Sequence, residues 1–266
     1  MGVQKIIGSD IERGIPYPPY HTGPTFEEYA CEYFKNKENF YPVYWTRILN
    51  CSNAGSKIQA VQELTSLPDR ENGFTISTHD DAPLPFKKTK NFSAGGNMAG
   101  IPIPLIGSKP PYEATKKTIL IQFHGSITHS IRKPIEDLTG IKDFNIKIKN
   151  WTSKICKADE ENNFSEMAKA KFILCPRGYG PTSFRLYEAL HLKSIPIYIS
   201  NNFYLPFTDK INWEKIAILA HTVDEGIRMA YKLTEAEISE MLEYTQEKLA
   251  LLTDFKTICN EIDGLT

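Results

Sequence analysis

The sequence has few of the features that mark secreted, membrane-bound or nucleic-acid-binding proteins. Its 266 residues include five cysteines, an odd number with wide spacing and no CxxC pair, which favours buried thiols in a reducing compartment over a disulfide framework. The stretch MGVQKIIGSDIERG contains no apolar segment of signal-peptide or anchor length. Basic and acidic residues nearly balance, 31 against 32, so no nucleic-acid footprint is present. We expect a soluble, cytoplasmic protein with no membrane span and no nucleic-acid partner.

Metal-ligand spacing is also missing from the sequence. The six histidines are scattered, and the adjacent pair Asp80-Asp81 alone offers too few ligands for an Mn²⁺ site. We therefore expect no metal and no other cofactor.

Residues 171–207, KFILCPRGYGPTSFRLYEALHLKSIPIYISNNFYLPF, are the most informative part of the chain. An apolar run at 172–174 is followed by a loop at 175–181, a helical pattern from 183 to 192 and a second apolar run at 195–199. This order of strand, loop, helix and strand predicts a parallel sheet in an α/β protein. In such sheets the ligand lies at the strand-to-helix loop.

The loop before this helix has the composition of a phosphate site. Gly178 and Gly180, with Tyr179 between them, permit a ligand to approach the backbone closely. Thr182 or Ser183 is placed to cap the helix, whose first N–H groups carry partial positive charge.

Charged side chains around the helix start support the phosphate hypothesis. Arg177 in the loop and Arg185 in the first turn can offer two guanidinium groups to a diphosphate. Glu188, one turn after Arg185, can accept both hydroxyls of a ribose. The same pattern also fits a surface ion pair between Arg185 and Glu188 beside a simple glycine turn, and the pattern alone does not separate the two.

A second candidate site follows a predicted strand at residues 74–78. That strand ends at His79-Asp80-Asp81, and ligands gather at the carboxyl ends of strands in open α/β sheets. These side chains are therefore candidates for acid–base chemistry. The alternative is a turn capped by Asp80 beside a structural histidine.

A third candidate follows the apolar run 118–123, which predicts a buried parallel strand. His124-Gly125-Ser126 ends this strand, and a helix carrying Arg132 is expected next. Gly125 gives a nucleotide room, and Arg132 can reach a phosphate. Arg132 is equally compatible with a solvated helix position.

Capping patterns divide the rest of the chain. They predict helices starting near Thr25, Ser56, Asn163 and Thr234, the last being one long final helix whose apolar stripe reaches Phe255. A strand is predicted at 144–149, and residues 213–220 form a further apolar segment. Residues 83–111 are expected to be irregular, forming the acceptor-side rim and the crossing into a second domain.

Three of these segments resemble the exostosin-type glycosyltransferase family. The stretch CPRGYGPTSFRLYEALHLKSIPIYISNNFYLPF is similar to its signature, and NGFTISTHDDAP is similar to its histidine-aspartate motif, with Asp80 at the family aspartate. The strand and turn at 118–126, followed by Arg132, resemble the start of its C-terminal domain. The sequence departs from the family at Ser194, where glycine is usual, and at residues 201–202, where two asparagines replace paired acidic residues.

The resemblance implies an α/β fold of the GT-B type, with two Rossmann-like lobes, parallel sheets and a long C-terminal helix. We expect a compact acceptor-side lobe with the catalytic base at residues 1–112. A nucleotide-sugar-binding lobe at 113–233 and a helix packing across both lobes at 234–266 complete the expected organisation. The aspartate-x-aspartate pattern of metal-dependent glycosyltransferases has no convincing counterpart, so the cationic loop is expected to take the metal's place.

The resemblance further implies an inverting enzyme that transfers a sugar from a UDP-sugar to an oligosaccharide or glycoprotein glycan, forming a β-linkage. Asp80 is the expected base, with Asp81 in reserve and His79 as a third candidate. The absence of an extra basic cluster favours a neutral sugar such as xylose. The expected donor-binding residues are Gly125, Ser126, Arg132, Arg177, Gly178, Tyr179, Thr182, Ser183, Arg185 and Glu188. The alternatives are a non-catalytic sugar-nucleotide or glycan-binding partner of another glycosyltransferase, and an unrelated nucleotide-binding protein.

Overall fold

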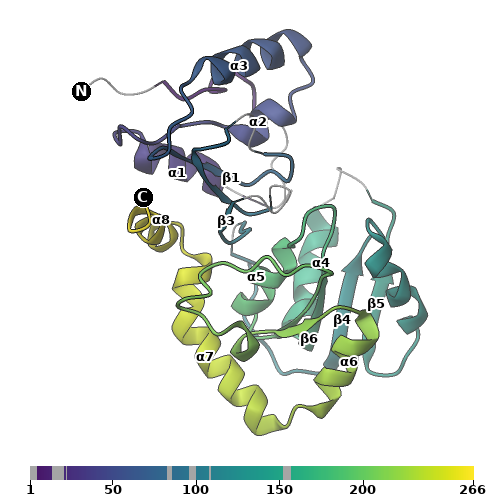
Figure 1. Ribbon diagram of the computed structural model, residues 1–266. Coiled ribbons are helices and arrows are strands. Elements are labelled where there is room, and N and C mark those ends of the chain that lie inside the picture. The colour runs from purple at the N-terminus through teal and green to yellow at the C-terminus, as the bar shows by residue number, and fades with distance from the viewer. Residues whose placement is uncertain are drawn as a thin grey trace.

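The computed structural model describes residues 5–13, 21, 23–82, 86–95, 100–107, 109–151 and 157–266. Its two parallel sheets lie in separate lobes, one above the other in Figure 1. The first sheet has the order β1-β2-β3, with strands Phe74–Ser77, Lys90–Ser93 and Ile101–Pro102. The second has the order β5-β4-β6-β7-β8. The predicted α/β class with two parallel-sheet lobes is confirmed.

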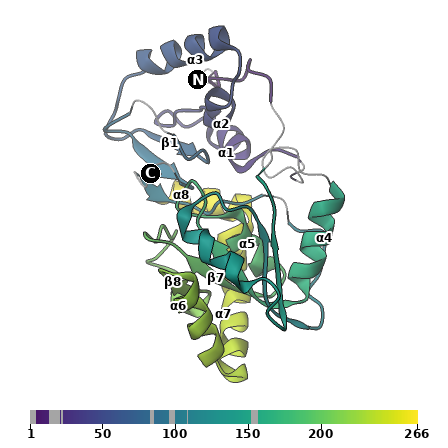
Figure 2. The same cartoon turned by 90° about the vertical axis from the view of Figure 1, so that its right-hand side faces the viewer.

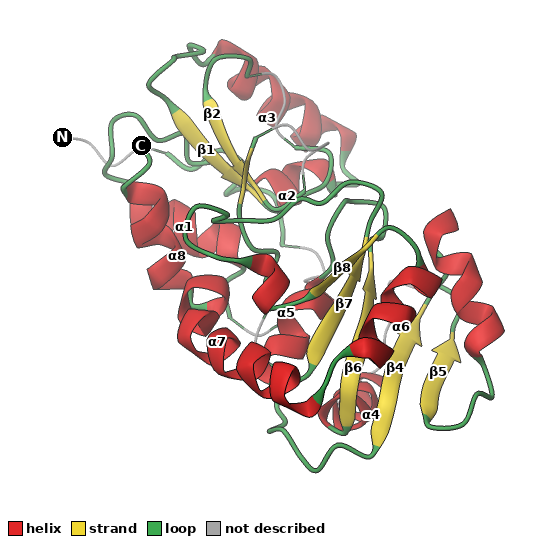
Figure 3. Cartoon of the chain, turned by 60° about the horizontal axis from the view of Figure 1, so that its bottom comes forward, coloured by secondary structure: helices red, strands yellow, loops and turns green. Residues whose placement is uncertain are grey.

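The order of the second sheet places a ligand site between β4 and β6. Its strands are β4 (Ile119–Gly125), β5 (Phe144–Ile148), β6 (Ala170–Pro176), β7 (Ile195–Ile199) and β8 (Ile218–Ala220). After β5 the chain returns past β4 to form β6, so the winding direction reverses there (Figure 3). Open parallel sheets bind ligands beyond the carboxyl ends of the strands at this reversal.

Helices cover both faces of the second sheet. On one face pack α4 (Lys157–Ala168) and α5 (Phe184–His191), and on the other pack the 3₁₀ helix η2 (Ser130–Leu138) and α6 (Val223–Lys232). A further 3₁₀ turn, η3 (Trp213–Lys215), precedes β8. Alternate residues of β6 serve the two faces, with Ile173 and Cys175 in one apolar cluster and Phe172 and Leu174 in the other. This double burial explains the unbroken apolar run in the sequence.

The first lobe packs aromatic side chains between its sheet and helix α1. Its helices are α1 (Phe26–Phe34), α2 (Trp45–Leu49) and α3 (Ala54–Ser66). Phe34, Phe40 and Phe92 each contact the ring of Phe74, with ring centroids 4.9–6.0 Å apart. The same apolar cluster continues into the second lobe through Ile103 and Leu105, so the two lobes share a core.

The predicted final helix is two helices. Helix α7 (Glu235–Thr253) packs on the second lobe, and α8 (Phe255–Asp263) crosses to the first (Figure 2). Asp254 ends α7 in an extended conformation, and its carboxylate accepts from the Thr257 N–H at 2.8 Å. The apolar stripe therefore ends at Leu252, and Phe255 instead packs edge-on against Phe26 with centroids 5.3 Å apart.

Two predicted capping sites are correct and two are wrong. Capping boxes at Thr25/Glu28 and Thr234/Glu237 start α1 and α7. Helix α3 begins earlier than predicted because Asn53 caps it by accepting from the Ser56 N–H at 3.1 Å. Asn163 lies inside α4, where its side chain accepts from Gln122 of β4 at 2.9 Å.

Residues 83–111 were predicted to be irregular, yet they contain β2 and β3. Both strands are short, and they complete the first sheet beside β1. A sequence segment of two to four residues has too little periodicity to indicate a strand. Pro83 at the start of this region, all of residues 14–20 and Cys156 lie outside the described residues.

Candidate functional site

Arg177 lies in the loop directly after β6, where the winding direction of the sheet reverses. Its Nη1 donates to Asn201 Oδ1 at 2.6 Å and its Nη2 to the Tyr179 carbonyl at 3.0 Å. Its Nε is buried and has no hydrogen-bond partner. A buried guanidinium N–H without a hydrogen-bond partner costs folding free energy unless a ligand accepts from it. The site therefore has an unused donor where the sequence predicts an anion.

The start of α5 provides a second unused donor, in the side chain of Arg185. Ser183 is the N-cap of this helix, in extended conformation, and its side chain makes no capping hydrogen bond. Arg185 stacks over the Phe123 ring at 4.7 Å and donates from Nη2 to the His124 carbonyl at 2.6 Å. Its Nε is likewise buried without a partner. Two arginines, one in the preceding loop and one in the first turn, thus flank this helix start.

Gly125, at the end of β4, makes room for Arg185. A Cβ at position 125 would lie 3.1 Å from Arg185 Nη2 and 3.0 Å from the Phe123 ring. Any larger residue would push the guanidinium off the ring. Gly125 is therefore next to the predicted site, and the group it accommodates in the structure is the Arg185 side chain.

Arg132 connects two loops of the site. It is 8% exposed and lies in η2, which is a 3₁₀ helix, so the solvated helix position is excluded. It donates to the carbonyls of Ser126, Pro176 and Arg177 at 2.8–2.9 Å. These bonds fix the carboxyl ends of β4 and β6 relative to each other.

Asp80, from the first lobe, lies against the loop of the second lobe. Its carboxylate accepts a hydrogen bond from the Gly180 N–H. A Cβ on either Gly95 or Gly180 would collide with this carboxylate, so both positions require glycine. Burial, followed by the neighbouring Asp81 charge, raises the pKa of Asp80 to about 6. The structure thus brings together the two segments that sequence analysis predicted separately.

His79 and Asp81 flank this carboxylate in different settings. His79 Nδ1 accepts from the Asp81 N–H at 3.1 Å, so the proton is assigned to Nε2, which lies 3.1 Å from Asn50 Oδ1. Burial lowers the pKa of His79. Asp81 extends to the other lobe, where its Oδ1 accepts from the Tyr179 hydroxyl at 3.1 Å. His79 is therefore held by the first lobe, whereas Asp81 faces the second.

The other predicted donor-site residues lie in the loop between β6 and α5 or in α5 itself. Gly178 lies beside Arg132, since a Cβ there would be 3.3 Å from Arg132 Nη2. Thr182 is buried next to the Tyr187 hydroxyl. Glu188, on α5, lies close enough to Glu160 of α4 to contribute, after burial, to raising the pKa of Glu160 to about 7. All of these positions belong to the β6–α5 unit.

The two departures from the family pattern have separate roles. Asn201 holds Arg177 by a neutral hydrogen bond, so this contact does not neutralise the guanidinium as an aspartate would. Ser194 is remote from the site: its hydroxyl donates to the Ala170 carbonyl at 2.8 Å and accepts from Lys117 at 2.9 Å. The first departure alters the site, and the second only the packing before β7.

Sequence analysis missed Glu27, which anchors the His79–Asp81 turn. Glu27 is 1% exposed in α1, and its two carboxylate oxygens accept from the N–H groups of Thr46 at 2.9 Å and Thr78 at 3.1 Å. Thr78 directly precedes His79. Burial raises the pKa of Glu27 to about 7. The sequence signal was an acidic residue beside the capping Glu28, which is indistinguishable from an ordinary first-turn carboxylate.

We expect Glu27→Ala to lower the free energy of unfolding by about 2–4 kcal/mol, because it leaves two buried N–H groups without an acceptor. Urea denaturation at neutral pH measures this effect. Glu32→Ala on the same helix is the control, since the Glu32 side chain is 57% exposed and pairs only with Lys35 nearby. Equal midpoints for the two variants would show that Glu27 does not hold the turn.

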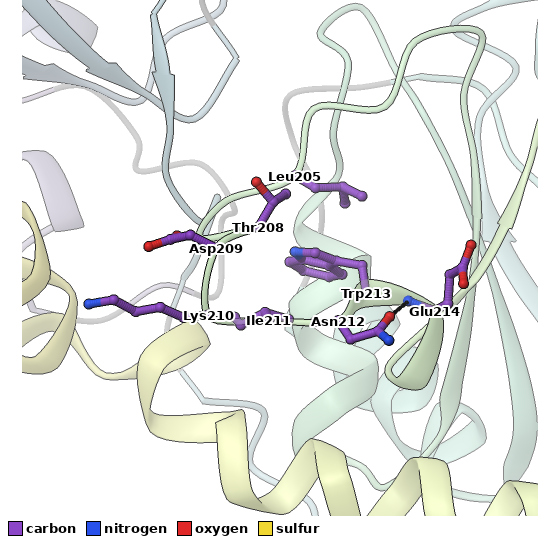
Figure 4. A pocket seen from close by; sticks show the side chains of 8 residues that line it. All are labelled: Leu205, Thr208, Asp209, Lys210, Ile211, Asn212, Trp213 and Glu214. Atoms are coloured by element: carbon purple, nitrogen blue, oxygen red, sulfur yellow. Dashed lines mark hydrogen bonds between the residues drawn. The ribbon is translucent and has the colours of Figure 1, made fainter.

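A separate hollow of about 490 Å³ lies on the loop between β7 and η3 (Figure 4). The Trp213 ring and the side chains around it belong to this loop and to η3, and none of the predicted site residues lines the hollow. Its lining residues are Leu205, Thr208, Asp209, Lys210, Ile211, Asn212, Trp213 and Glu214.

None of the helices in the described residues is long and apolar enough to cross a membrane. No three His, Cys, Asp or Glu side chains in the described ranges converge to hold a metal ion.

Fold and site together define a class. Two α/β lobes with parallel sheets meet where a carboxylate of one faces a cationic strand-to-helix loop of the other, which is a GT-B-like arrangement. The family model of the Exostosin GT47 domain matches residues 85–225, more than half of the chain. The protein belongs to the exostosin GT47 family.

Several plant proteins are similar to parts of this chain. A probable glycosyltransferase of Arabidopsis thaliana is 26% identical over 130 residues, which are 48% of this chain and 23% of that protein. A probable beta-1,4-xylosyltransferase of the same plant is 41% identical over 61 residues, 23% of this chain and 15% of its own. A probable glucuronosyltransferase of rice, Oryza sativa subsp. japonica, is 46% identical over 55 residues, 21% of this chain and 13% of its own. The matched parts are thus less than a quarter of each relative.

A distant structural likeness was also found. The crystal structure of TarM aligns with 78% of this chain and 57% of its own at 10% identity and a TM-score of 0.39.

Proposed function

We propose that the protein is an inverting glycosyltransferase that moves a sugar from a UDP-sugar to a glycan hydroxyl, forming a β-linkage. The observation that carries the proposal is the contact of Asp80 with the Gly180 N–H, which places a carboxylate of raised pKa against the cationic loop. An inverting transfer is one in-line displacement, which needs a base on the acceptor and stabilisation of the leaving group on opposite sides of the sugar.

The donor diphosphate is proposed to bind at the start of α5. The unpartnered Nε groups of Arg177 and Arg185 are donors that a pyrophosphate would accept from, and the start of a helix favours an anion at the same end. Charge grows on this group as the glycosidic bond to UDP breaks, so the fixed cations lower the barrier. Arg132 positions the loops, and Glu188 is proposed to accept the ribose hydroxyls.

Asp80 is proposed to take the proton of the acceptor hydroxyl. The oxygen forms its bond to the anomeric carbon as the carbon–oxygen bond to UDP breaks, and the proton passes to the carboxylate. A carboxyl group with a pKa of about 6 is ionised at neutral pH and is more basic than an ordinary aspartate. The site therefore has a base that is both available and effective at neutral pH.

The pH dependence of transfer follows from this pKa. We expect the rate at saturating acceptor to rise with pH up to about 6 and then level off, because transfer requires ionised Asp80. Asp81→Asn removes one cause of the raised pKa, so the rising limb moves to lower pH. Burial is the larger cause and remains, so the limb stays above the ordinary value of 3.8. The pH profile of UDP release measures this shift. If the rising limb of Asp81→Asn stayed in place or moved to higher pH, Asp80 would not be the group that titrates.

The donor sugar is proposed to be neutral, with UDP-xylose the first candidate. Apart from Arg132, which donates to three backbone carbonyls, the site residues described above include no cation beyond those assigned to the diphosphate. A probable xylosyltransferase is also among the relatives. The acceptor is proposed to be an oligosaccharide or glycoprotein glycan, and the reaction to proceed without a metal in a soluble, cytoplasmic protein. We propose that residues 1–112 bind the acceptor, 113–233 bind the donor and 234–266 join the lobes.

Ligand-observed NMR with a panel of UDP-sugars tests the proposal without knowledge of the acceptor. We expect UDP and at least one UDP-sugar to bind, and Arg185→Ala to weaken both. Failure of UDP to bind would favour an unrelated α/β protein. Binding without UDP release in the presence of every glycan tried would favour a non-catalytic partner of another glycosyltransferase.

A further inference from the structure

Tyr179 is an exposed aromatic residue whose side-chain hydroxyl and backbone carbonyl both form hydrogen bonds. Tyr179 is 72% exposed to solvent, although it lies in the middle of the loop between β6 and α5. Its hydroxyl donates to Asp81 Oδ1 of the other lobe at 3.1 Å, and its carbonyl accepts from Arg177 at 3.0 Å. The ring is therefore fixed in orientation while most of its surface remains open to solvent. A preordered ring can stack on a ligand with little loss of conformational entropy.

Asp81 presents a partly free carboxylate beside this ring. Its side chain is 49% exposed, and its Oδ2 lies 3.9 Å from His79 Nδ1, which is too long for a hydrogen bond. That His79 nitrogen already accepts from the Asp81 N–H. Asp81 Oδ2 can therefore accept hydrogen bonds from a ligand while Oδ1 holds the tyrosine.

This pair lies on the acceptor side of the proposed reaction. Asp81 follows the proposed base Asp80 directly in the chain, and both face the same loop. A carboxylate repels the diphosphate of a sugar nucleotide, so Asp81 is unsuited to the donor. It is well suited to a sugar ring that has hydroxyl groups to donate and no negative charge of its own.

We propose that Tyr179 and Asp81 together form the acceptor subsite and that it takes a neutral sugar residue of the acceptor glycan. The apolar face of the sugar packs on the Tyr179 ring, and its hydroxyl groups donate to Asp81. A neighbouring hydroxyl then lies at Asp80. A uronic acid residue is excluded because its carboxylate meets that of Asp81. This inference rests on the proposed function and assigns Tyr179 to the acceptor in place of the donor predicted from the sequence.

Saturation-transfer NMR with the full chain in the presence of UDP tests the subsite independently of turnover. The probes are xylotetraose, cellotetraose and tetragalacturonate. We expect at least one neutral oligosaccharide to bind and tetragalacturonate not to bind. Tyr179→Ala should weaken binding of the neutral oligosaccharide roughly tenfold, the loss of one aromatic stacking contact, and leave UDP binding unchanged. Tyr179→Phe keeps the ring, so its affinity for the neutral oligosaccharide should fall less than that of Tyr179→Ala.

Asp81→Asn is the second variant, because it removes the charge and keeps the shape. This variant should bind tetragalacturonate more tightly than the wild type does. A purely structural role of Asp81 would not produce that change. Tyr231→Ala is the matched control: Tyr231 is 62% exposed near the end of α6 and is not among the site residues. It should bind every probe as the wild type does.

Three outcomes would overturn the subsite. They are unchanged oligosaccharide binding by Tyr179→Ala, loss of UDP binding by that variant, and failure of both neutral probes to bind the wild type while UDP binds. Failure of UDP itself to bind the wild type would instead count against the proposed function as a whole.

Discussion

Asp80→Asn should abolish most sugar transfer and leave UDP binding intact. The amide keeps the size of the carboxylate and can still accept from the Gly180 N–H, but it cannot take a proton from the acceptor. General-base catalysis contributes about 10²–10⁴-fold, so we expect a loss in that range in the rate of UDP release. The UDP affinity measured by ligand-observed NMR should not change, because Asp80 belongs to the other lobe.

The stability of this variant provides an independent check. The folded-state pKa of Asp80 is raised above its ordinary value of 3.8, so the ionised carboxylate opposes folding once the pH rises through about 6. Asparagine carries no such charge, and the thermal midpoint at neutral pH should equal or exceed that of the wild type. Lower activity with a lower midpoint would indicate a disturbed fold, and undiminished transfer would move the base to Asp81 or His79.

Arg177→Ala should reduce transfer by roughly 10²–10³-fold, the usual effect of removing one preorganised donor to a developing charge. The variant also loses the bonds to Asn201 and to the Tyr179 carbonyl, so UDP binding should weaken as well. Steady-state kinetics together with UDP titration separate the two effects. Arg177→Lys should recover part of the loss, because it restores the charge without the planar fork.

Arg228→Ala is the matched control for this prediction. Arg228 is 68% exposed on α6 and pairs with Asp224 at 3.1 Å, so its removal should change neither kinetics nor UDP affinity. Near-normal transfer by Arg177→Ala would show that the donor diphosphate does not bind at this loop.

The sequence predicts the second lobe closely because its strands are buried on both faces and its helix starts carry local signals. The expected run at 195–199 is β7, and the predicted strand–loop–helix around Arg177 is β6 and α5 within two residues. The first lobe is harder to predict. Its strands β2 and β3 are too short to show a period, and they become strands only by pairing with β1.

The site itself shows what local signals cannot predict. Its cationic residues are adjacent in sequence and were found together, whereas the Asp80–Gly180 contact joins residues 100 positions apart (180 minus 80). The role of Arg132 was also not predictable, because its three carbonyl acceptors depend on how two loops meet. Glu27 was missed for the same reason, since its partners lie on other elements.

Helix α8 has a consequence for how the protein is made. It covers α1 and the turn after it through the Phe26–Phe255 contact, the Tyr33–Asn260 hydrogen bond and the Lys37–Asp263 ion pair. During synthesis α8 emerges from the ribosome after both lobes, and contacts so distant in sequence form slowly. The first lobe therefore completes its packing only once α8 has been made, and until then its apolar surface is open to chaperones.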